Sequence, residues 1–312
     1  MYAGWSRDEL VRLSSSSGGI FTELARTILE MNGVVYGVVW DDEIFLPRHE
    51  RAIDELHVKK MRGSKYLPSY VGKILQEVLN DLKSDRAVLF SGTPCQIAAL
   101  KRLVEIENVN DAKLYTVDLI CHGVPSIIVF KGYLQYISGG RKIRYITFRD
   151  KGKGWSRFRV KISFENGSFY IAEHDKDPFY LGFIEDLYLN RVCYNCPFQK
   201  IPRLSDITLG DFWGVPRSLR DERGVSIIMV NSAKGQNLLK MTENLELIKI
   251  SLKEALRINQ SIIYREKKIP RNRDKVIKKA TIYGFNSIIP IIFKLRIKRK
   301  LKLLLNLIYN KL

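Results

Sequence analysis

The four cysteines restrict the folding of this chain more than any other feature of its sequence. Cys193 and Cys196 form a Cys-x-x-Cys pair, whose two thiols can point at one centre. The other two occur singly, Cys95 in SGTPCQ and Cys121 in ICHGVP. If all four thiols meet, a long stretch of chain must fold around one small group.

The two single cysteines follow similar local patterns. RAVLFSGTPCQIAAL (86–100) predicts a strand, a glycine turn and a helix that begins near Cys95. LYTVDLI (114–120) predicts a second strand, followed by Cys121 in a turn and then another helix. Open α/β sheets bind their ligands at such strand ends, and neighbouring strands lie about 4.8 Å apart. If these strands are neighbours, Cys95 and Cys121 belong to one site.

Spacing alone leaves four interpretations of the cysteines open. A zinc ion takes four thiolates, although structural zinc sites usually pair two Cys-x-x-Cys motifs. An iron–sulfur cluster also takes four thiolates and tolerates scattered ligands. Alternatively, Cys95 is a nucleophile at a helix N-terminus, which favours its thiolate form, with His122 as base and Asp118 as the orienting group. The fourth interpretation is four core cysteines without a metal, since cysteine is often buried.

Three loops have residues suited to a phosphate-bearing ligand with a planar ring. The first precedes a predicted helix that ends at Gly33 and has Phe21, Leu24, Ala25, Ile28 and Leu29 on one face. Its free N–H groups suit a phosphate, and an ordinary N-cap is the alternative. The second joins two predicted helices and carries two cations, a hydroxyl and an aromatic ring, although a solvated connection has the same composition. The third is the turn before Cys95. The residues are Ser15, Ser16, Ser17, Gly18, Gly19, Arg62, Gly63, Ser64, Lys65, Tyr66, Ser91, Gly92 and Thr93.

The remaining patterns predict an α/β fold. VVYGVVW (34–40) and GVSIIMVN (224–231) read as buried strands, and 141–173 as a β-hairpin around an Asn166-Gly167 turn. Helices are expected over 177–189 and over 234–258, the latter with a break near 243–250. We expect two α/β units around a shared cofactor site, an added antiparallel hairpin and a basic C-terminal helical tail. The expected segments are an N-terminal domain (1–84), a domain with the cysteines (85–264) and the tail (265–312).

The positive charge is concentrated in the tail. The chain has a net charge of +19, but residues 265–312 alone contain fifteen lysines and arginines against two acidic residues. This distribution argues against a specific nucleic-acid-binding surface and favours contact of the tail with an anionic membrane surface or another protein. The polar start MYAGWSRDEL lacks the pattern of a secretory signal, and no apolar run reaches eighteen residues. We expect a cytoplasmic protein, peripheral on the inner face of the membrane.

Seven motifs occur in one order: SSSGGIFTELA, RGSKY, FSGTPCQIAALK, ICHGVPS, FRDKGKGW, CYNCPF and SDITLGDFWG. Together they resemble the coenzyme F420 hydrogenase/dehydrogenase beta-subunit family, over roughly residues 10–235. The resemblance implies a flavoprotein oxidoreductase that carries FAD and a [4Fe–4S] cluster and relays electrons. It also implies that Cys95, Cys121, Cys193 and Cys196 are the cluster ligands, and that the three loops above hold the flavin.

The sequence departs from many relatives of that family in one respect. They carry a ferredoxin-like segment with additional cysteines before the Ser/Gly loop, and a chain with four cysteines has none to spare for a second cluster. We therefore expect an external electron donor or acceptor: a ferredoxin, a deazaflavin or a reduced flavin carrier. Related sequences in surface-polysaccharide gene groups imply a role in polysaccharide biosynthesis. The alternative is a zinc-pinned, non-redox binding module or scaffold of a membrane-associated complex.

Overall fold

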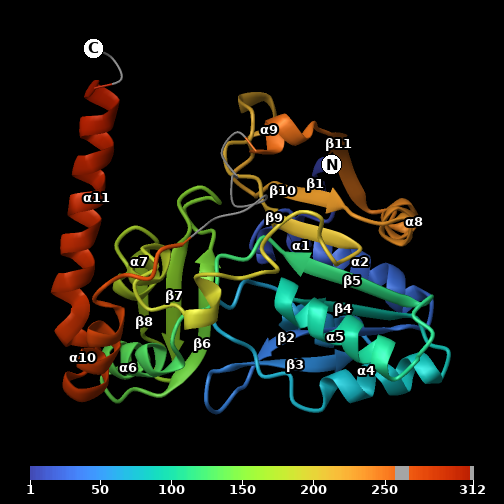
Figure 1. Ribbon diagram of the computed structural model, residues 1–312, viewed down its shortest axis with the longest axis horizontal. Coiled ribbons are helices and arrows are strands. Elements are labelled where there is room, and N and C mark those ends of the chain that lie inside the picture. The colour runs from blue at the N-terminus through green and yellow to red at the C-terminus, as the bar shows by residue number, and fades with distance from the viewer. Residues whose placement is uncertain (257–266, 310–312) are drawn as a thin grey trace.

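The computed structural model describes residues 1–256 and 267–309 and contains two β-sheets (Figure 1). The larger sheet has eight strands in the order β11-β1-β10-β9-β5-β4-β2-β3. They are β1 (Tyr2–Ser6), β2 (Val34–Trp40), β3 (Pro47–Ala52), β4 (Val88–Gly92), β5 (Leu114–Leu119), β9 (Ile207–Asp211), β10 (Ser226–Val230) and β11 (Leu245–Lys249). The central strands β2, β4, β5 and β9 run parallel, and the outer strands pair antiparallel.

Helices cover both faces of the central strands, which explains why these strands are apolar throughout. In β2, Val35 and Val39 pack in the cluster that includes α2, α3 and α8, whereas Val34 and Tyr36 pack with α4 and α5 on the opposite face. The helices associated with this sheet are α1 (Glu9–Ser14), α2 (Ile20–Glu30), α3 (Glu55–Met61), α4 (Ile74–Lys83), α5 (Pro94–Ile106), α8 (Ala233–Met241) and α9 (Leu252–Leu256).

The smaller sheet is antiparallel, with the order β6-β7-β8, and lies at the left of Figure 1. Its strands are β6 (Ile143–Asp150), β7 (Arg159–Phe164) and β8 (Phe169–Glu173). One aromatic-rich core joins it to α6 (Ile127–Ser138), α7 (Pro178–Ile184), α10 (Arg273–Tyr283) and α11 (Ile289–Tyr309). Short 3-10 helices occur at η1 (Arg191–Cys193), η2 (Arg217–Leu219) and η4 (Phe285–Ile288).

The predicted α/β fold is confirmed, including its main structural inference. β4 and β5 pair in parallel with Gly92 opposite Asp118, so the turns that carry Cys95 and Cys121 follow neighbouring strands. The hairpin around Asn166-Gly167 joins β7 to β8, and β6 extends it to three strands. The basic tail is helical over α10 and α11, while residues 265–266 and 310–312 lie outside the described part.

Other predictions about local structure need correction. The expected break at 243–250 is strand β11, which pairs with β1 and therefore has a partner that local periodicity cannot reveal. The helix expected over 177–189 ends at Ile184, and residues 257–258 of the other expected helix lie outside the described residues. Strands from 1–84 and from 85–264 share the larger sheet. The boundaries at 84 and 264 stay a prediction.

Candidate functional site

A pocket of about 440 Å³ lies where the carboxyl ends of β4, β5 and β9 face the smaller sheet. Gly92, Leu119 and Asp211 mark those three strand ends in its wall. Arg149 at the end of β6 and Tyr180 on α7 supply the opposite wall. The pocket thus occupies the position at which parallel α/β sheets bind ligands.

Two of the predicted loops meet at this pocket through direct hydrogen bonds. The Ser64 N–H donates to Ser16 Oγ at 2.6 Å, and the hydroxyls of these residues lie 2.9 Å apart. Arg62 donates from Nε to Thr22 Oγ1 and from Nη1 to Ser14 Oγ, each at 3.1 Å. The loop over 62–66 is therefore fixed against the loop that precedes α2.

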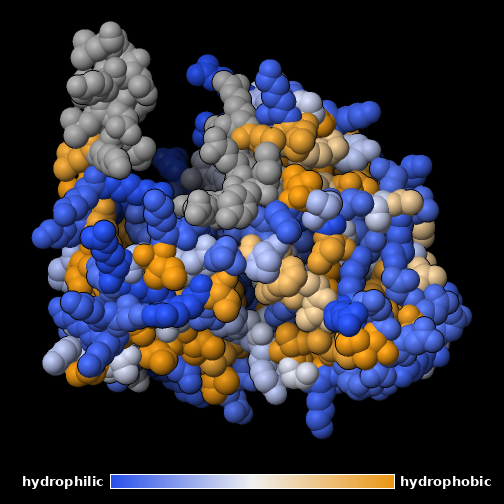
Figure 2. Space-filling view, in the orientation of Figure 1, coloured by the Kyte–Doolittle hydropathy of each residue, from blue (hydrophilic) through white to orange (hydrophobic). Residues whose placement is uncertain are grey.

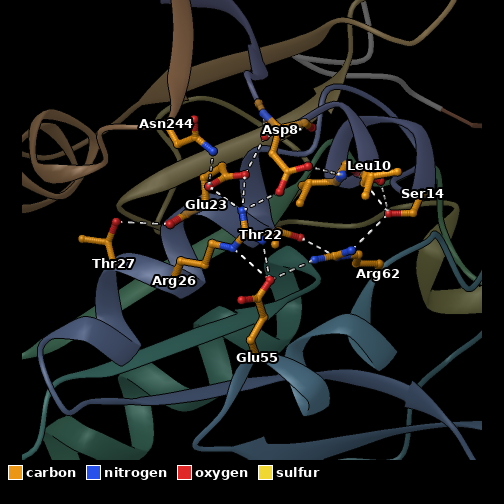
Figure 3. A network of polar contacts seen from close by, with 12 residues as sticks. Asp8, Leu10, Ser14, Thr22, Glu23, Arg26, Thr27, Glu55, Arg62 and Asn244 are labelled. Atoms are coloured by element: carbon orange, nitrogen blue, oxygen red, sulfur yellow. Dashed lines mark hydrogen bonds and ion pairs between the residues drawn. The ribbon is translucent and has the colours of Figure 1, made fainter.

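A charged network supports the first loop from behind (Figure 3). Arg26 of α2 pairs with Asp8 and Glu23, each at 3.1 Å, and with Glu55 at the start of α3. Glu55 lies 3.7 Å from Arg62 Nη2, and Figure 3 shows Arg26 and Arg62 on either side of that carboxylate. The network joins α1, α2 and α3 around the loop, so its position is determined by several elements at once.

Arg149 is a deeply buried cation of the pocket wall, and its side chain is 2% exposed. It donates two hydrogen bonds to the Asp211 carboxylate, at 2.7 and 2.9 Å, in the bidentate arrangement that guanidinium favours. It also donates to the Ser16 carbonyl at 3.0 Å and to the Tyr66 hydroxyl at 3.1 Å. The guanidinium lies over Phe158, with 4.1 Å to the ring centroid. One buried side chain therefore links all these parts of the site.

Two lysines bind backbone carbonyls of the loops. Lys65 donates from Nζ towards the carbonyls at the end of α3, including Arg62 O at 3.1 Å. Lys151 donates to Ser17 O at 2.8 Å and to Arg12 O at 2.9 Å. Burial is the largest cause of a lowered pKa in both lysines. The pKa falls to about 7 for Lys65 and also to about 7 for Lys151. Near neutral pH, the charges of these two lysines, of which Lys65 lines the pocket, therefore depend on pH.

Twelve of the thirteen predicted cofactor-binding residues line the large pocket, and Gly18 does not. The Gly18 N–H donates to Ser226 Oγ at 2.8 Å, and a Cβ at this position would lie 2.4 Å from Gly4 O. Gly18 thus packs directly against β1. Gly19 lines the pocket and is the N-cap of α2, with a left-handed backbone (φ 87°).

A second, smaller pocket of about 120 Å³ is lined by all four cysteines. Cys95 is the second residue of α5, Cys121 follows β5, Cys193 ends η1, and Cys196 lies three residues further on. The two pockets share part of their walls, and the shared residues are Ser69, Thr93, Gln96, Cys121, Gly123 and Val124. The sequence-distant thiols therefore surround one space that directly adjoins the larger pocket.

The backbone around Cys121 is built for close approach of the second cysteine segment. Gly123 has φ 112°, and a Cβ there would meet Cys193 Cβ at 3.1 Å. Its N–H donates to Cys121 Sγ at 3.3 Å, while the Gln199 amide donates to the Cys121 carbonyl. Burial raises the pKa of Cys121 to about 12 and also raises the pKa of Cys193. Both side chains are consequently neutral thiols at pH 7 unless a cation draws off their protons.

The arrangement of the thiols is looser than that of a closed single-ion site. Within residues 1–256 and 267–309, no group of three or more His, Cys, Asp or Glu side chains is gathered closely enough to hold a metal ion. A tetrahedral zinc site needs every sulfur about 2.3 Å from one point. A four-iron cluster takes one thiolate at each of four iron atoms, so its ligands stand farther apart around a larger body.

The side chains expected to activate Cys95 as a nucleophile, His122 and Asp118, have other partners. His122 Nε2 lies 2.9 Å from Asp186 Oδ1, whereas Asp118, the expected orienting group, lies buried 3.8 Å from Arg203. The Cys95 sulfur contacts Thr93 Oγ1 at 3.1 Å. Asp118 therefore does not orient His122.

Sequence reasoning missed several residues of the large pocket: Arg149, Tyr180, Phe183, Asp211 and Trp213. The signal was partly present, because Arg149 lies in FRDKGKGW and Asp211 and Trp213 lie in SDITLGDFWG. Their roles depend on contacts between segments about 60 residues apart, such as the Arg149–Asp211 pair with a sequence separation of 62.

Comparisons with known proteins agree with this architecture. Two family models, described as the N-terminal and the C-terminal parts of the coenzyme F420 hydrogenase/dehydrogenase beta subunit, match residues 1–76 and 85–254 respectively. A chain in the structure titled "Xenon derivatization of the F420-reducing [NiFe] hydrogenase complex from Methanosarcina barkeri" is similar in fold, with a TM-score of 0.58 and 19% sequence identity. The alignment covers 92% of this chain and 93% of that chain. The chain therefore belongs to the coenzyme F420 hydrogenase/dehydrogenase beta-subunit family.

Proposed function

We propose that this chain holds FAD in the large pocket and a [4Fe–4S] cluster between its four cysteines, and relays electrons between an external redox partner and an acceptor. Membership of the family implies an oxidoreductase with an electron-transfer role. The structure from Methanosarcina barkeri is of a hydrogenase complex by its title, which supports a redox partner for this chain as well. The candidate partners remain a ferredoxin, a deazaflavin or a reduced flavin carrier.

The common wall of the two pockets is the observation that carries the proposal. Thr93, Gln96 and Cys121 line both spaces, so groups bound in the two pockets would be separated by little more than one layer of side chains. Electron transfer requires the two groups to lie close together, whereas a purely structural zinc ion does not require a ligand pocket beside it.

The large pocket suits a flavin dinucleotide in size and chemistry. Its volume falls within the range of about 300–1,000 Å³ that is typical of small-molecule sites. Arg62 and the start of α2 offer positive charge and N–H groups for a pyrophosphate. The aromatic side chains of Tyr66, Tyr180 and Trp213 offer flat apolar surfaces for a ring.

When bound, the flavin would exchange electrons with the acceptor and the cluster would pass single electrons, while the protein binds and orients both groups. Arg149 keeps its charge in the wall because Asp211 compensates it. Tyr180 and Phe183 of α7 line the pocket and would restrict the access of water to a bound flavin. Gly123 N–H, directed at Cys121 Sγ, would stabilise that sulfur as a thiolate ligand.

Metal and flavin analysis after anaerobic purification tests the proposal. We expect about four iron atoms and one FAD per chain, flavin absorbance and an EPR signal after reduction. Cys95→Ser and Cys193→Ser should both lose most of the iron, because each removes one of four ligands. For the flavin, Arg62→Gln should lower FAD retention, whereas Arg86→Gln, an exposed arginine outside the pocket, should not.

The same measurements separate the alternatives. One zinc per chain without iron would contradict the redox proposal and support a zinc-pinned scaffold. Full metal content in Cys95→Ser, with loss of activity, would instead favour the cysteine nucleophile. A link to surface-polysaccharide biosynthesis is part of the proposal through the resemblance stated above; deletion of the gene should then change the surface glycan.

A further inference from the structure

Helix α11 has two faces of different character, and the inner one is already occupied. Ile288, just before the helix, and Ile292 are fully buried in the core shared with the smaller sheet. Arg296 and Arg299 both pair with Glu185 at the end of α7, at 3.1 and 2.7 Å. These contacts fix α11 on the body of the protein, so its opposite face has a defined direction.

The outer face of α11 consists of Phe293, Lys294, Ile297, Lys298 and Leu301. Their spacing of three and four residues places them on one side of an α-helix. The exposed fractions are 38% for Phe293, 58% for Ile297 and 54% for Leu301, which is unusual for large apolar side chains on a helix. Lys294 and Lys298 are also exposed. Figure 2 shows hydrophobic and hydrophilic residues side by side over the described part of α11, at the left of the view.

The surroundings of this outer face are positive. No acidic residue follows Asp274 in the sequence. The neighbouring helix α10 exposes Lys275, Lys278 and Lys279, and it ends in exposed Tyr283, which is 69% accessible. An apolar stripe in a cationic field is complementary to a surface that offers negative charge above a hydrophobic layer.

We propose that the outer face of α11 binds an anionic lipid bilayer and lies along its surface. No helix among the described residues combines the length and hydrophobicity needed to cross a membrane. In α11 itself, six lysines and arginines between positions 294 and 302 oppose spanning. An apolar stripe flanked by lysines is instead typical of helices that insert into the boundary between headgroups and acyl chains.

An acidic protein is the competing occupant, and the stripe argues against it. Cations alone would complement an acidic protein surface, whereas exposed Phe293, Ile297 and Leu301 gain most from a hydrophobic layer beneath the charges. The inference is independent of the cofactors, since none of these residues lines either pocket.

Vesicle flotation with the full-length protein tests this proposal. Vesicles of phosphatidylcholine alone are compared with vesicles that contain about one third phosphatidylglycerol, at moderate ionic strength. We expect binding to the anionic vesicles only. Each lysine near an anionic surface contributes about fivefold to affinity, so Lys294→Gln/Lys298→Gln should weaken binding about 30-fold. Lys240→Gln/Lys253→Gln, on α8 and α9 far from α11 in Figure 1, is the matched control and should bind normally.

A second variant separates insertion from charge. Phe293→Ser/Ile297→Ser keeps both lysines and should also bind more weakly. This loss of affinity should depend less on salt concentration than the loss in Lys294→Gln/Lys298→Gln. Far-UV circular dichroism and iron and flavin content verify that the variants remain folded. Absence of wild-type binding to anionic vesicles, or equal binding by the tail variants and the control, would refute the proposal. Loss in the lysine variant with normal binding by the serine variant would also overturn it, because charge alone would then carry the binding and the apolar stripe would not insert into the bilayer.

Discussion

Removal of the Asp211 carboxylate is expected to destabilise the protein through the buried charge that it leaves behind. Asp211 accepts two hydrogen bonds from Arg149 and one from Trp155 Nε1 at 2.9 Å. In Asp211→Ala, the guanidinium loses its counter-ion while its side chain is 2% exposed. Breaking one partner of such a pair costs about 3–5 kcal/mol. An exposed pair is the control: Arg102 and Glu105 are 66% and 70% exposed, and Glu105→Ala should cost about 0.2–1 kcal/mol.

Urea unfolding, followed by circular dichroism and tryptophan fluorescence, measures both free energies of unfolding. The double variant Arg149→Met/Asp211→Ala completes the test, because it removes the stranded charge together with its partner. It should be clearly more stable than Asp211→Ala, by about 2 kcal/mol or more. If Asp211→Ala costs no more than Glu105→Ala, or if the two substitutions at the pair are additive, the account of Arg149 is wrong.

Two further predictions concern the surroundings of the pocket. Burial lowers the pKa of His49 to about 4, so the folded state does not take up the proton that the unfolded state binds near pH 6.5. The free energy of unfolding should therefore fall by about 3 kcal/mol between pH 6.5 and 4, and His49→Gln should remove that share of the pH dependence in urea titrations. Gly18→Ala would place a Cβ 2.4 Å from Gly4 O and should therefore lower both the unfolding midpoint and FAD retention. Gly132→Ala, whose Cβ would lie 3.6 Å from its nearest atom, is the control and should be tolerated. Equal behaviour of the two variants would contradict the packing of the loop on β1.

The sequence predicts local structure and contacts most reliably for residues whose environment depends on their neighbours along the chain. Cys95 and Cys121 come together because two consecutive strand-turn-helix units are adjacent in the sheet, as the apolar runs before them indicated. By contrast, β1 has only five residues and β11 resembles a helix break; β1 is a strand because it pairs with β10 and β11, and β11 because it pairs with β1. Local periodicity contains no information about such distant pairing.

The site follows the same distinction. Ser16 and Arg62 could be proposed from loop composition, since serine, glycine and arginine are common in phosphate sites. Arg149 could not, because in its own sequence segment it resembles any exposed cation near the end of a strand. It belongs to the pocket only because Asp211 and Tyr66 meet it from other elements. Charged residues that become buried by tertiary contacts are thus the part of a site that a single sequence conceals.

The position of β1 between β10 and β11 determines when the larger sheet can be completed. The residues of β1 pair with Ser226–Ile228 and Leu245–Lys249, which leave the ribosome more than two hundred residues later. Until then, the edges of β1 lack both partners, and closing that contact costs the entropy of a very long loop. We therefore expect the final assembly of the sheet to be slow and to follow the synthesis of β11, with β1 entering last between two strands that are made long after it.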